Sequence, residues 1–144
     1  MKLIPLIART GMALLLLVQL GCANSRPDQL YRDLGELVGI TAIVEELLVL
    51  MGENPRIAHH FAEADIVNLR DKLVEQFCVE AGGPCVYTGT TMDVAHAGLD
   101  LSESDFNALV EDLQRSMEAQ DVPISAQNRL LARLAPMQRD ILHR

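Results

Sequence analysis

The sequence has no tryptophan, and aromatic residues of all kinds make up only 3% of the chain. It also has few basic residues, since 12 Lys and Arg stand against 20 Asp and Glu, and the formal net charge is −8. Because no basic cluster is present to bind phosphates, the composition argues against a nucleic-acid partner. A glycine-rich nucleotide loop, internal repeats and low-complexity runs are absent as well.

The remaining composition is that of one folded domain. The 144 residues are 49% hydrophobic and 22% charged, as in a globular protein rather than a disordered one. A chain of this length suits a single hydrophobic core.

The N-terminus has the pattern of a secretory signal peptide. Lys2 and Arg9 precede an apolar run over 12–18, and small residues follow it. The run is short for a membrane span. The expected organisation is a signal peptide at 1–21, a tether at 22–29 and a folded domain at 30–144.

Leu20-Gly-Cys22 resembles the lipobox of bacterial lipoproteins, in which the cysteine is acylated and becomes the new N-terminus. Gln19 departs from the motif, which usually carries an aliphatic residue there. The alternatives are an ordinary cleaved signal peptide or a retained anchor. The prediction is a lipid on Cys22, which would place the domain in the periplasm, tethered to a membrane surface.

The folded region is predicted to be all-α, because apolar residues recur at helical spacing and no stretch alternates with a period of two. Gly52–Pro55 and Gly82–Pro84 are expected to end two helices. Ser102–Asp105 forms a variant capping box, Ser125 is an N-cap candidate, and Pro136 is expected to kink the last helix.

A shorter element over 89–98 carries the side chain of most chemical interest. Met92, Ala95 and Leu99 are its apolar residues, and His96 lies beside them at helical spacing. A neutral imidazole can ligate a metal through one ring nitrogen while a neighbour orients the other. From the residues alone, a core histidine with ordinary hydrogen bonds remains the alternative.

The ordered set Gly82-Gly-Pro84, Tyr87-Thr-Gly89, Met92 and His96 resembles the group I truncated haemoglobins, which are small globins with a two-over-two helical sandwich. The resemblance extends from about residue 30 to about residue 142. It implies that the chain binds haem b (iron protoporphyrin IX) and, at the haem iron, oxygen or another diatomic gas.

The resemblance also implies roles for individual residues. His96 matches the proximal ligand of the haem iron, Phe61 would pack on the porphyrin face, and Lys72 would approach a haem propionate. The proximal pocket would be lined by Met92, Ala95, Leu101 and Phe106. The distal pocket would be lined by Leu48, Leu69 and Leu73.

Two departures from the family pattern stand out. The family commonly places Tyr and Gln in the distal pocket, whereas this chain has the three leucines, with Gln76 one turn further on. The usual hydrogen-bond donors to oxygen are therefore expected to be missing, which argues against efficient nitric oxide dioxygenation. Gly35-Glu36 replaces a pair of glycines, which we interpret as a harmless surface change.

Other polar residues are expected to have ordinary roles. His59 and His60 are adjacent and point in different directions, so we expect solvent-facing loop or propionate-edge histidines rather than iron ligands. The carboxylate pairs Glu45-Glu46 and Glu111-Asp112 are predicted to lie on solvated helix faces rather than in a catalytic cleft.

The two cysteines of the folded region, Cys78 and Cys85, flank the Gly82–Pro84 turn. An oxidising compartment would allow them to form a disulfide. One buried thiol and one loop thiol is the alternative.

Three functional hypotheses follow. The first is reversible binding of oxygen, carbon monoxide or nitric oxide at haem, for oxygen carriage or sensing. The second is a haem enzyme, a nitric oxide dioxygenase or peroxidase, which would need a partner reductase because the chain has no flavin or nicotinamide domain. The third is a haem-free or haem-transferring interaction module. The sequence favours gas binding and leaves enzymatic turnover open.

Overall fold

The computed structural model describes residues 26–144, so the predicted signal peptide and Cys22 lie outside the described residues. The described part is helical without a β-strand, which confirms the all-α prediction. Within it, no helix is both long and apolar enough to cross a membrane. In chain order the elements are α1 (Gln29–Asp33), α2 (Glu36–Glu53), the 3-10 helix η1 (Ala58–Phe61), α3 (Ile66–Glu80), α4 (Met92–Ala95), α5 (Glu103–Ala119), α6 (Ile124–Leu134), the 3-10 helix η2 (Ala135–Met137) and α7 (Gln138–Ile141).

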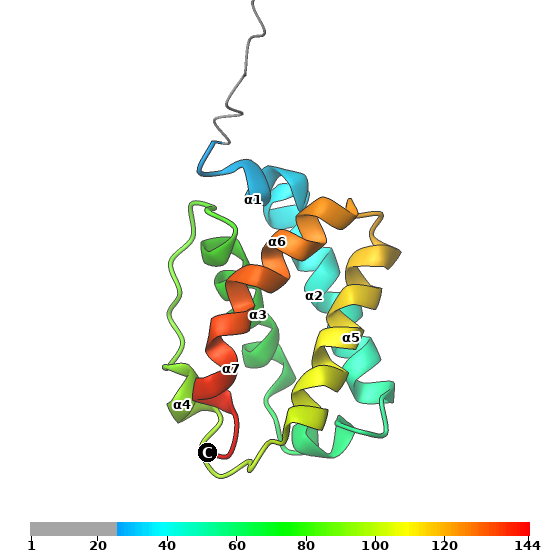
Figure 1. Ribbon diagram of the computed structural model, residues 1–144, viewed down its shortest axis with the longest axis vertical. Helices are drawn as coiled ribbons and strands as arrows, with labels where there is room; N and C mark the ends of the chain where they lie inside the picture. Colours follow the sequence, from blue (N-terminus) through cyan, green and yellow to red (C-terminus); the bar gives the residue numbers. More distant parts are fainter. Residues whose placement is uncertain (1–25) are drawn as a thin grey trace, which may run out of the picture.

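The four long helices form two layers (Figure 1). α2 packs against both α3 and α5, and α6 packs against α3 and α5. A long loop leaves the end of α3, runs along the outside of the molecule and reaches the short helix α4, which lies beside α7. This arrangement matches the two-over-two helical sandwich that the family resemblance implies.

The hydrophobic core is built around α2. Burial of a large aliphatic side chain contributes about 1.5–3 kcal/mol. Because α2 buries several of them, it forms the frame to which the shorter elements attach. Its buried face consists of Ile40, Ile43, Val44, Leu47 and Met51. The other helices bury Phe77, Ala108, Leu113, Met117, Ala126 and Leu130 against this face.

Most of the predicted helix ends are confirmed. The Ser102 hydroxyl accepts the backbone N–H of Asp105, whose carboxylate accepts the backbone N–H of Ser102, so the capping box is present. α6 ends at Leu134 and η2 follows with Pro136 in its middle, because proline has no N–H to donate to the helix. The predicted N-cap at Ser125 is wrong, since α6 begins directly after Pro123.

The start of α2 corrects another interpretation. Gly35 and Glu36 have φ angles of 82° and 58°, both in the left-handed region. Glycine adopts this conformation freely, whereas a residue with a side chain loses about 1–2 kcal/mol there. Glu36 is therefore a strained position at the first residue of α2, not a harmless surface change.

The predicted solvation of Glu111 and Asp112 is correct for Glu111 and wrong for Asp112, which is fully buried. The amide of Asn54 donates to Asp112 Oδ2 at 2.8 Å, and the guanidinium of Arg115 donates to Asp112 Oδ1. The carboxylate therefore fastens the end of α2 to α5.

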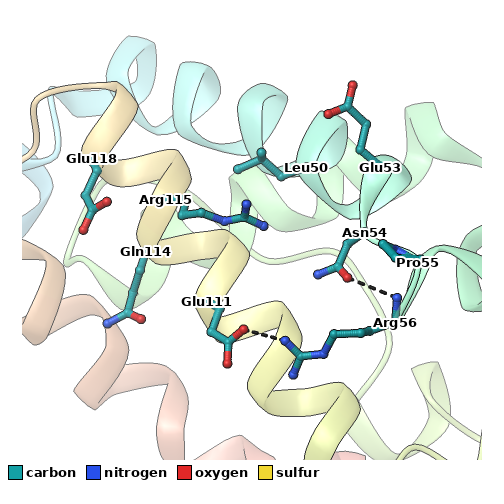
Figure 2. Close-up of a pocket in the computed structure, with 9 residues that line it drawn as sticks. All are labelled: Leu50, Glu53, Asn54, Pro55, Arg56, Glu111, Gln114, Arg115 and Glu118. Atoms are coloured by element: carbon teal, nitrogen blue, oxygen red, sulfur yellow. Dashed lines mark hydrogen bonds and ion pairs between the residues drawn. The ribbon is translucent and has the colours of Figure 1, made fainter.

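A hollow of about 670 Å³ lies beside this joint, between the end of α2 and α5 (Figure 2). Arg56 crosses it, with its backbone N–H on Asn54 Oδ1 at 3.1 Å and its guanidinium on Glu111 at 2.5 Å. None of the residues predicted to contact haem lines this hollow.

Asp112→Asn keeps the shape of the buried side chain and removes its charge. We expect it to lower the free energy of unfolding by about 1.5–3 kcal/mol, because the hydrogen bonds from Asn54 and Arg115 lose their charged acceptor. Glu111→Gln, the same change at the exposed neighbour, should cost less than about 1 kcal/mol. Urea unfolding of both variants measures the difference, and equal losses would contradict the role of Asp112.

Candidate functional site

His96 directly follows the single turn of α4, and the carbonyl of Met92 holds it there twice. The backbone N–H of His96 donates to this oxygen at 3.1 Å, and the ring atom Nδ1 lies 2.7 Å from the same oxygen. Because a carbonyl oxygen only accepts, Nδ1 must carry the ring proton. In a neutral ring Nε2 then has a free lone pair, which is the form that ligates a metal.

The other predicted pocket residues come from several elements, and nearly all are half-buried. Apolar side chains with one covered and one open side suit a flat hydrophobic group, because such a group can bury the side that the core leaves open. Ala95, the other predicted pocket residue of α4, is exposed. The half-buried residues are Leu48 on α2, Phe61 on η1, Leu69, Lys72 and Leu73 on α3, Met92 on α4, Leu101 in the following loop and Phe106 on α5.

A second hollow, of about 660 Å³, opens between α3, the α3–α4 loop, α4 and the C-terminal helices. Met92 lies in its wall, so the hollow adjoins the residue that orients His96. Within residues 26–144, no cluster of three or more His, Cys, Asp or Glu side chains could hold a bare metal ion. Of the residues predicted to contact haem, Met92 lines this hollow and the others do not. What fits haem is the donor chemistry, because a single imidazole with a free Nε2 is the donor that haem iron takes when the protein supplies one ligand.

Lys72 is engaged with its own neighbours. Its ammonium donates to both carboxylate oxygens of Glu75 at 3.1 Å and to the hydroxyl of Thr88. The backbone N–H of Thr88 donates to Glu75 at 2.8 Å, and this bond is the main reason that the pKa of Glu75 lies below its usual value. The cluster ties the α3–α4 loop to α3, and Lys72 would have to share its donors to reach a propionate.

Gln76, one turn beyond the predicted distal leucines, has an amide that could donate to a bound gas, but the structure gives this amide other partners. Gln76 Nε2 lies 3.3 Å from Met92 Sδ and 3.3 Å from Met137 Sδ. Sequence reasoning missed Met137, whose helical spacing with Leu130 and Leu134 indicates only a core stripe.

His60 is not the solvent-facing residue that the sequence suggests. Its side chain is 14% exposed, and its Nε2 lies 3.8 Å from a carboxylate oxygen of Asp105. Among the described residues, this Nε2 is the buried side-chain atom that has no hydrogen-bond partner. The ring of the exposed His59 lies against the His60 ring, with centroids 4.0 Å apart and a tilt of 39° between the planes.

The last residues of the chain support the segment that follows His96. The backbone oxygen of Arg144 accepts the N–H groups of Gly98 at 2.9 Å and Asp100 at 3.1 Å, and His143 N–H donates to Leu101 O at 3.1 Å. The sequence pattern predicts none of these bonds, because they join residues 42 to 46 positions apart through backbone atoms alone.

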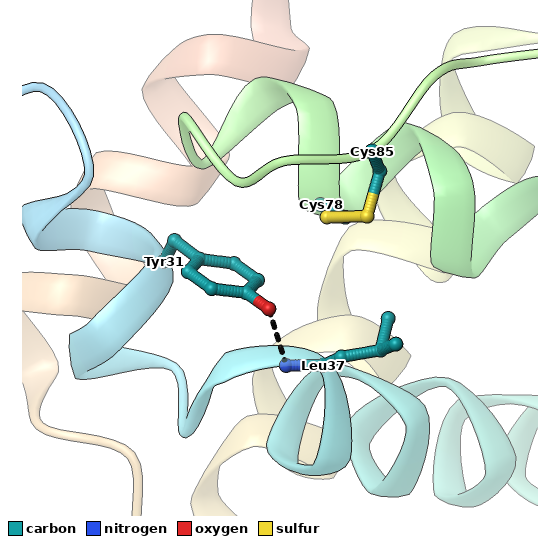
Figure 3. Close-up of a disulfide and its surroundings, with 4 residues drawn as sticks. All are labelled: Tyr31, Leu37, Cys78 and Cys85. Carbon is teal, nitrogen blue, oxygen red and sulfur yellow. Dashed lines mark hydrogen bonds between the residues drawn. A yellow bond between two sulfur atoms is a disulfide. The ribbon is translucent and has the colours of Figure 1, made fainter.

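The structure joins Cys78 and Cys85 in a disulfide, with their Cα atoms 5.9 Å apart (Figure 3). Cys78 is fully buried on α3, and Cys85 lies at the start of the loop to α4. Tyr31 lies on the other side of the turn, where its hydroxyl accepts the N–H of Leu37 at 3.1 Å. The disulfide thus fixes the origin of the loop that leads to His96.

Comparison with known proteins identifies the class to which this fold and site belong. The family model of the bacterial-like globins matches residues 29–143. The chain therefore belongs to the bacterial-like globin family.

Individual relatives narrow the class. The chain is 31% identical over 115 residues to the group 1 truncated hemoglobin GlbN of Nostoc commune, covering 80% of this chain and 98% of that protein. It is 26% identical over 118 residues to the corresponding protein of Mycolicibacterium paratuberculosis, covering 82% and 87%. The chain is thus a group 1 truncated haemoglobin.

Solved structures show the same fold. The truncated hemoglobin of Tetrahymena pyriformis in its Fe(III) form superposes with a TM-score of 0.77 at 23% identity, over 80% of this chain and 98% of that one. The 2/2 hemoglobin of Synechococcus sp. PCC 7002, in the cyanomet state with covalently attached heme, gives a TM-score of 0.73 at 21% identity.

We expect the double variant Cys78→Ser/Cys85→Ser to lose about 2–3 kcal/mol of unfolding free energy, because a disulfide that closes so short a loop restricts the unfolded chain by that amount in the chain-entropy model. Denaturant unfolding measures the loss. Alkylation of the unreduced wild-type protein followed by intact-mass analysis is the companion test. Two alkylated cysteines would refute the disulfide.

Proposed function

We propose that this chain is an exported globin that carries haem b and binds oxygen or another diatomic gas reversibly, for oxygen carriage or sensing. The observation that carries the proposal is the state of His96. Its Nδ1 proton is committed to the Met92 carbonyl, which leaves Nε2 as a ligand for haem iron.

Each part of the site has a role in this proposal. Bound haem would supply the iron at which a gas molecule binds. His96 would hold that iron from one side, and Phe61 and Phe106 would cover the ring with apolar surface. The half-buried leucines of α2 and α3 would keep water from the side opposite His96.

The distal side is proposed to be apolar. Leu48, Leu69 and Leu73 have no N–H or O–H group to donate, and the amide of Gln76 lies on two methionine sulfur atoms. A gas molecule that gains negative charge on binding is then held without a side-chain hydrogen bond. This supports reversible binding over oxygen chemistry that depends on holding oxygen in place.

Export and tethering complete the proposal. They rest on the signal pattern and on Leu20-Gly-Cys22, and the disulfide between Cys78 and Cys85 is consistent with an oxidising compartment. The proposed location is the periplasm, with a lipid on Cys22 at the membrane surface.

The purified full chain should carry one haem per polypeptide, held by His96. His96→Ala should lose most of the haem and change the Soret band, because no other imidazole replaces it in the same place. His59→Ala, at an exposed histidine of η1, is the matched control and should keep its haem. Unchanged haem content and spectrum in His96→Ala would overturn the ligand assignment.

Oxygen should leave the wild-type protein quickly. Leu48→Tyr adds a distal hydroxyl and should slow oxygen release by about ten- to hundredfold, because a hydrogen bond to a charged group contributes about 1.5–3 kcal/mol. Carbon monoxide accepts hydrogen bonds poorly, so its release should change little. Stopped-flow mixing measures both rates.

The opposite result for the wild-type protein would be slow oxygen release that speeds up in Gln76→Leu. In that case Gln76 donates to the gas after all, and the nitric oxide dioxygenase alternative gains support.

Wild-type protein expressed in a Gram-negative host should sediment with membranes, and Cys22→Ser should be soluble in the periplasm. The reason is that the thiol is the only group on which the lipid can be placed in the lipobox pattern. Fractionation and N-terminal mass analysis decide the point. A soluble wild-type protein whose N-terminus lies beyond residue 22 would indicate an ordinary signal peptide.

A further inference from the structure

The helix that leads to His96 is too short to hold its own position. α4 consists of the four residues Met92–Ala95, and helices of this length are unstable without tertiary contacts. Its placement therefore depends on its neighbours, and α7 is one of them. A second support comes from α3, on the other side of the hollow.

This second support is the side-chain amide of Gln76. An amide nitrogen carries two hydrogen atoms, and Gln76 Nε2 has two acceptors, Met92 Sδ and Met137 Sδ, each at 3.3 Å. Met92 is the first residue of α4, and Met137 is the last residue of η2. One amide on α3 therefore connects α4 and η2, which are distant along the chain from Gln76 and from each other.

Met92 is also the residue whose carbonyl accepts the Nδ1 proton of His96, at 2.7 Å. Gln76 therefore holds, by its side chain, the residue that orients the imidazole by its backbone. We propose that Gln76 is a positioning residue for His96, which acts through Met92 and with Met137 as the second anchor. The role of His96 as haem ligand rests on the proposed function, whereas the contact between Gln76 and α4 does not.

The competing role for Gln76 is that of a hydrogen-bond donor to the bound gas. Both roles need the same two amide hydrogens, and in the structure the thioether sulfur atoms take them. The two roles therefore exclude each other while both contacts are kept. They also predict different effects of Gln76→Leu, which keeps the approximate size of the side chain and removes both donors.

The first test follows hydrogen exchange by mass spectrometry on the full chain as purified, whether or not it carries haem. In Gln76→Leu the segment 89–98 should exchange about two- to tenfold faster, as expected for the loss of a neutral hydrogen bond, while α5 stays unchanged. Gln114→Leu is the matched control, because Gln114 is also half-buried but lies on α5 beside the remote hollow. It should leave segment 89–98 as in the wild type.

Met137→Leu provides the second variant, since it conserves the side-chain volume and removes one of the two acceptors. It should raise exchange in segment 89–98 less than Gln76→Leu does. If neither variant changes the exchange of this segment, or if both change it no more than Gln114→Leu, the positioning role is overturned.

The second test uses resonance Raman spectroscopy of the ferrous, gas-free protein. The iron–histidine stretching band reports the orientation and hydrogen bonding of the imidazole, so it should shift or broaden in Gln76→Leu and stay in place in Gln114→Leu. An unchanged band together with faster oxygen release would assign Gln76 to the gas instead. If the purified chain carries no haem, the proposed function fails. Hydrogen exchange then still tests whether Gln76 supports α4.

Discussion

The hydrogen bond between His96 Nδ1 and the carbonyl of Met92 is the interaction on which the site depends. It selects the ring tautomer, and with the backbone bond to the same oxygen it fixes where the ring lies relative to α4. The chemistry proposed for the chain requires a free Nε2, and this one carbonyl provides it. The residues that place Met92 therefore matter as much as the histidine itself.

The structure separates a rigid frame from a set of small supports around the site. The frame is α2 with the faces of α3, α5 and α6 packed on it, and its stability comes from buried aliphatic side chains and from the joint at Asp112. The segment 82–107, which contains His96, has no buried apolar side chain and so no comparable core. Its supports are the disulfide, the cluster around Glu75, the amide of Gln76 and the backbone bonds to Arg144.

The sequence predicts the frame well, because amphipathic periodicity reports which face of a long helix is buried. The assignment of His96 as haem ligand comes from the family pattern of the ordered glycines and Tyr87 around it, and it stays a prediction. The sequence does not predict Asp112, because a carboxylate looks the same in a sequence whether water or Asn54 solvates it. The strain at Glu36 and the contact of Met137 are not predicted for a related reason. Neither the φ angle of Glu36 nor the contact of Met137 with Gln76 on a distant helix leaves a local signal in the sequence.

The proposed site requires that His96 bind haem iron through Nε2 while Nδ1 keeps its proton. Proton NMR of the ferrous, gas-free protein tests it most directly, because a proton on the ligating imidazole is shifted far outside the usual range by the paramagnetic iron. We expect one such resonance, which disappears in deuterium oxide and is absent from His96→Gly. A haem-containing wild-type protein without this resonance, or a resonance that persists in His96→Gly, would contradict it.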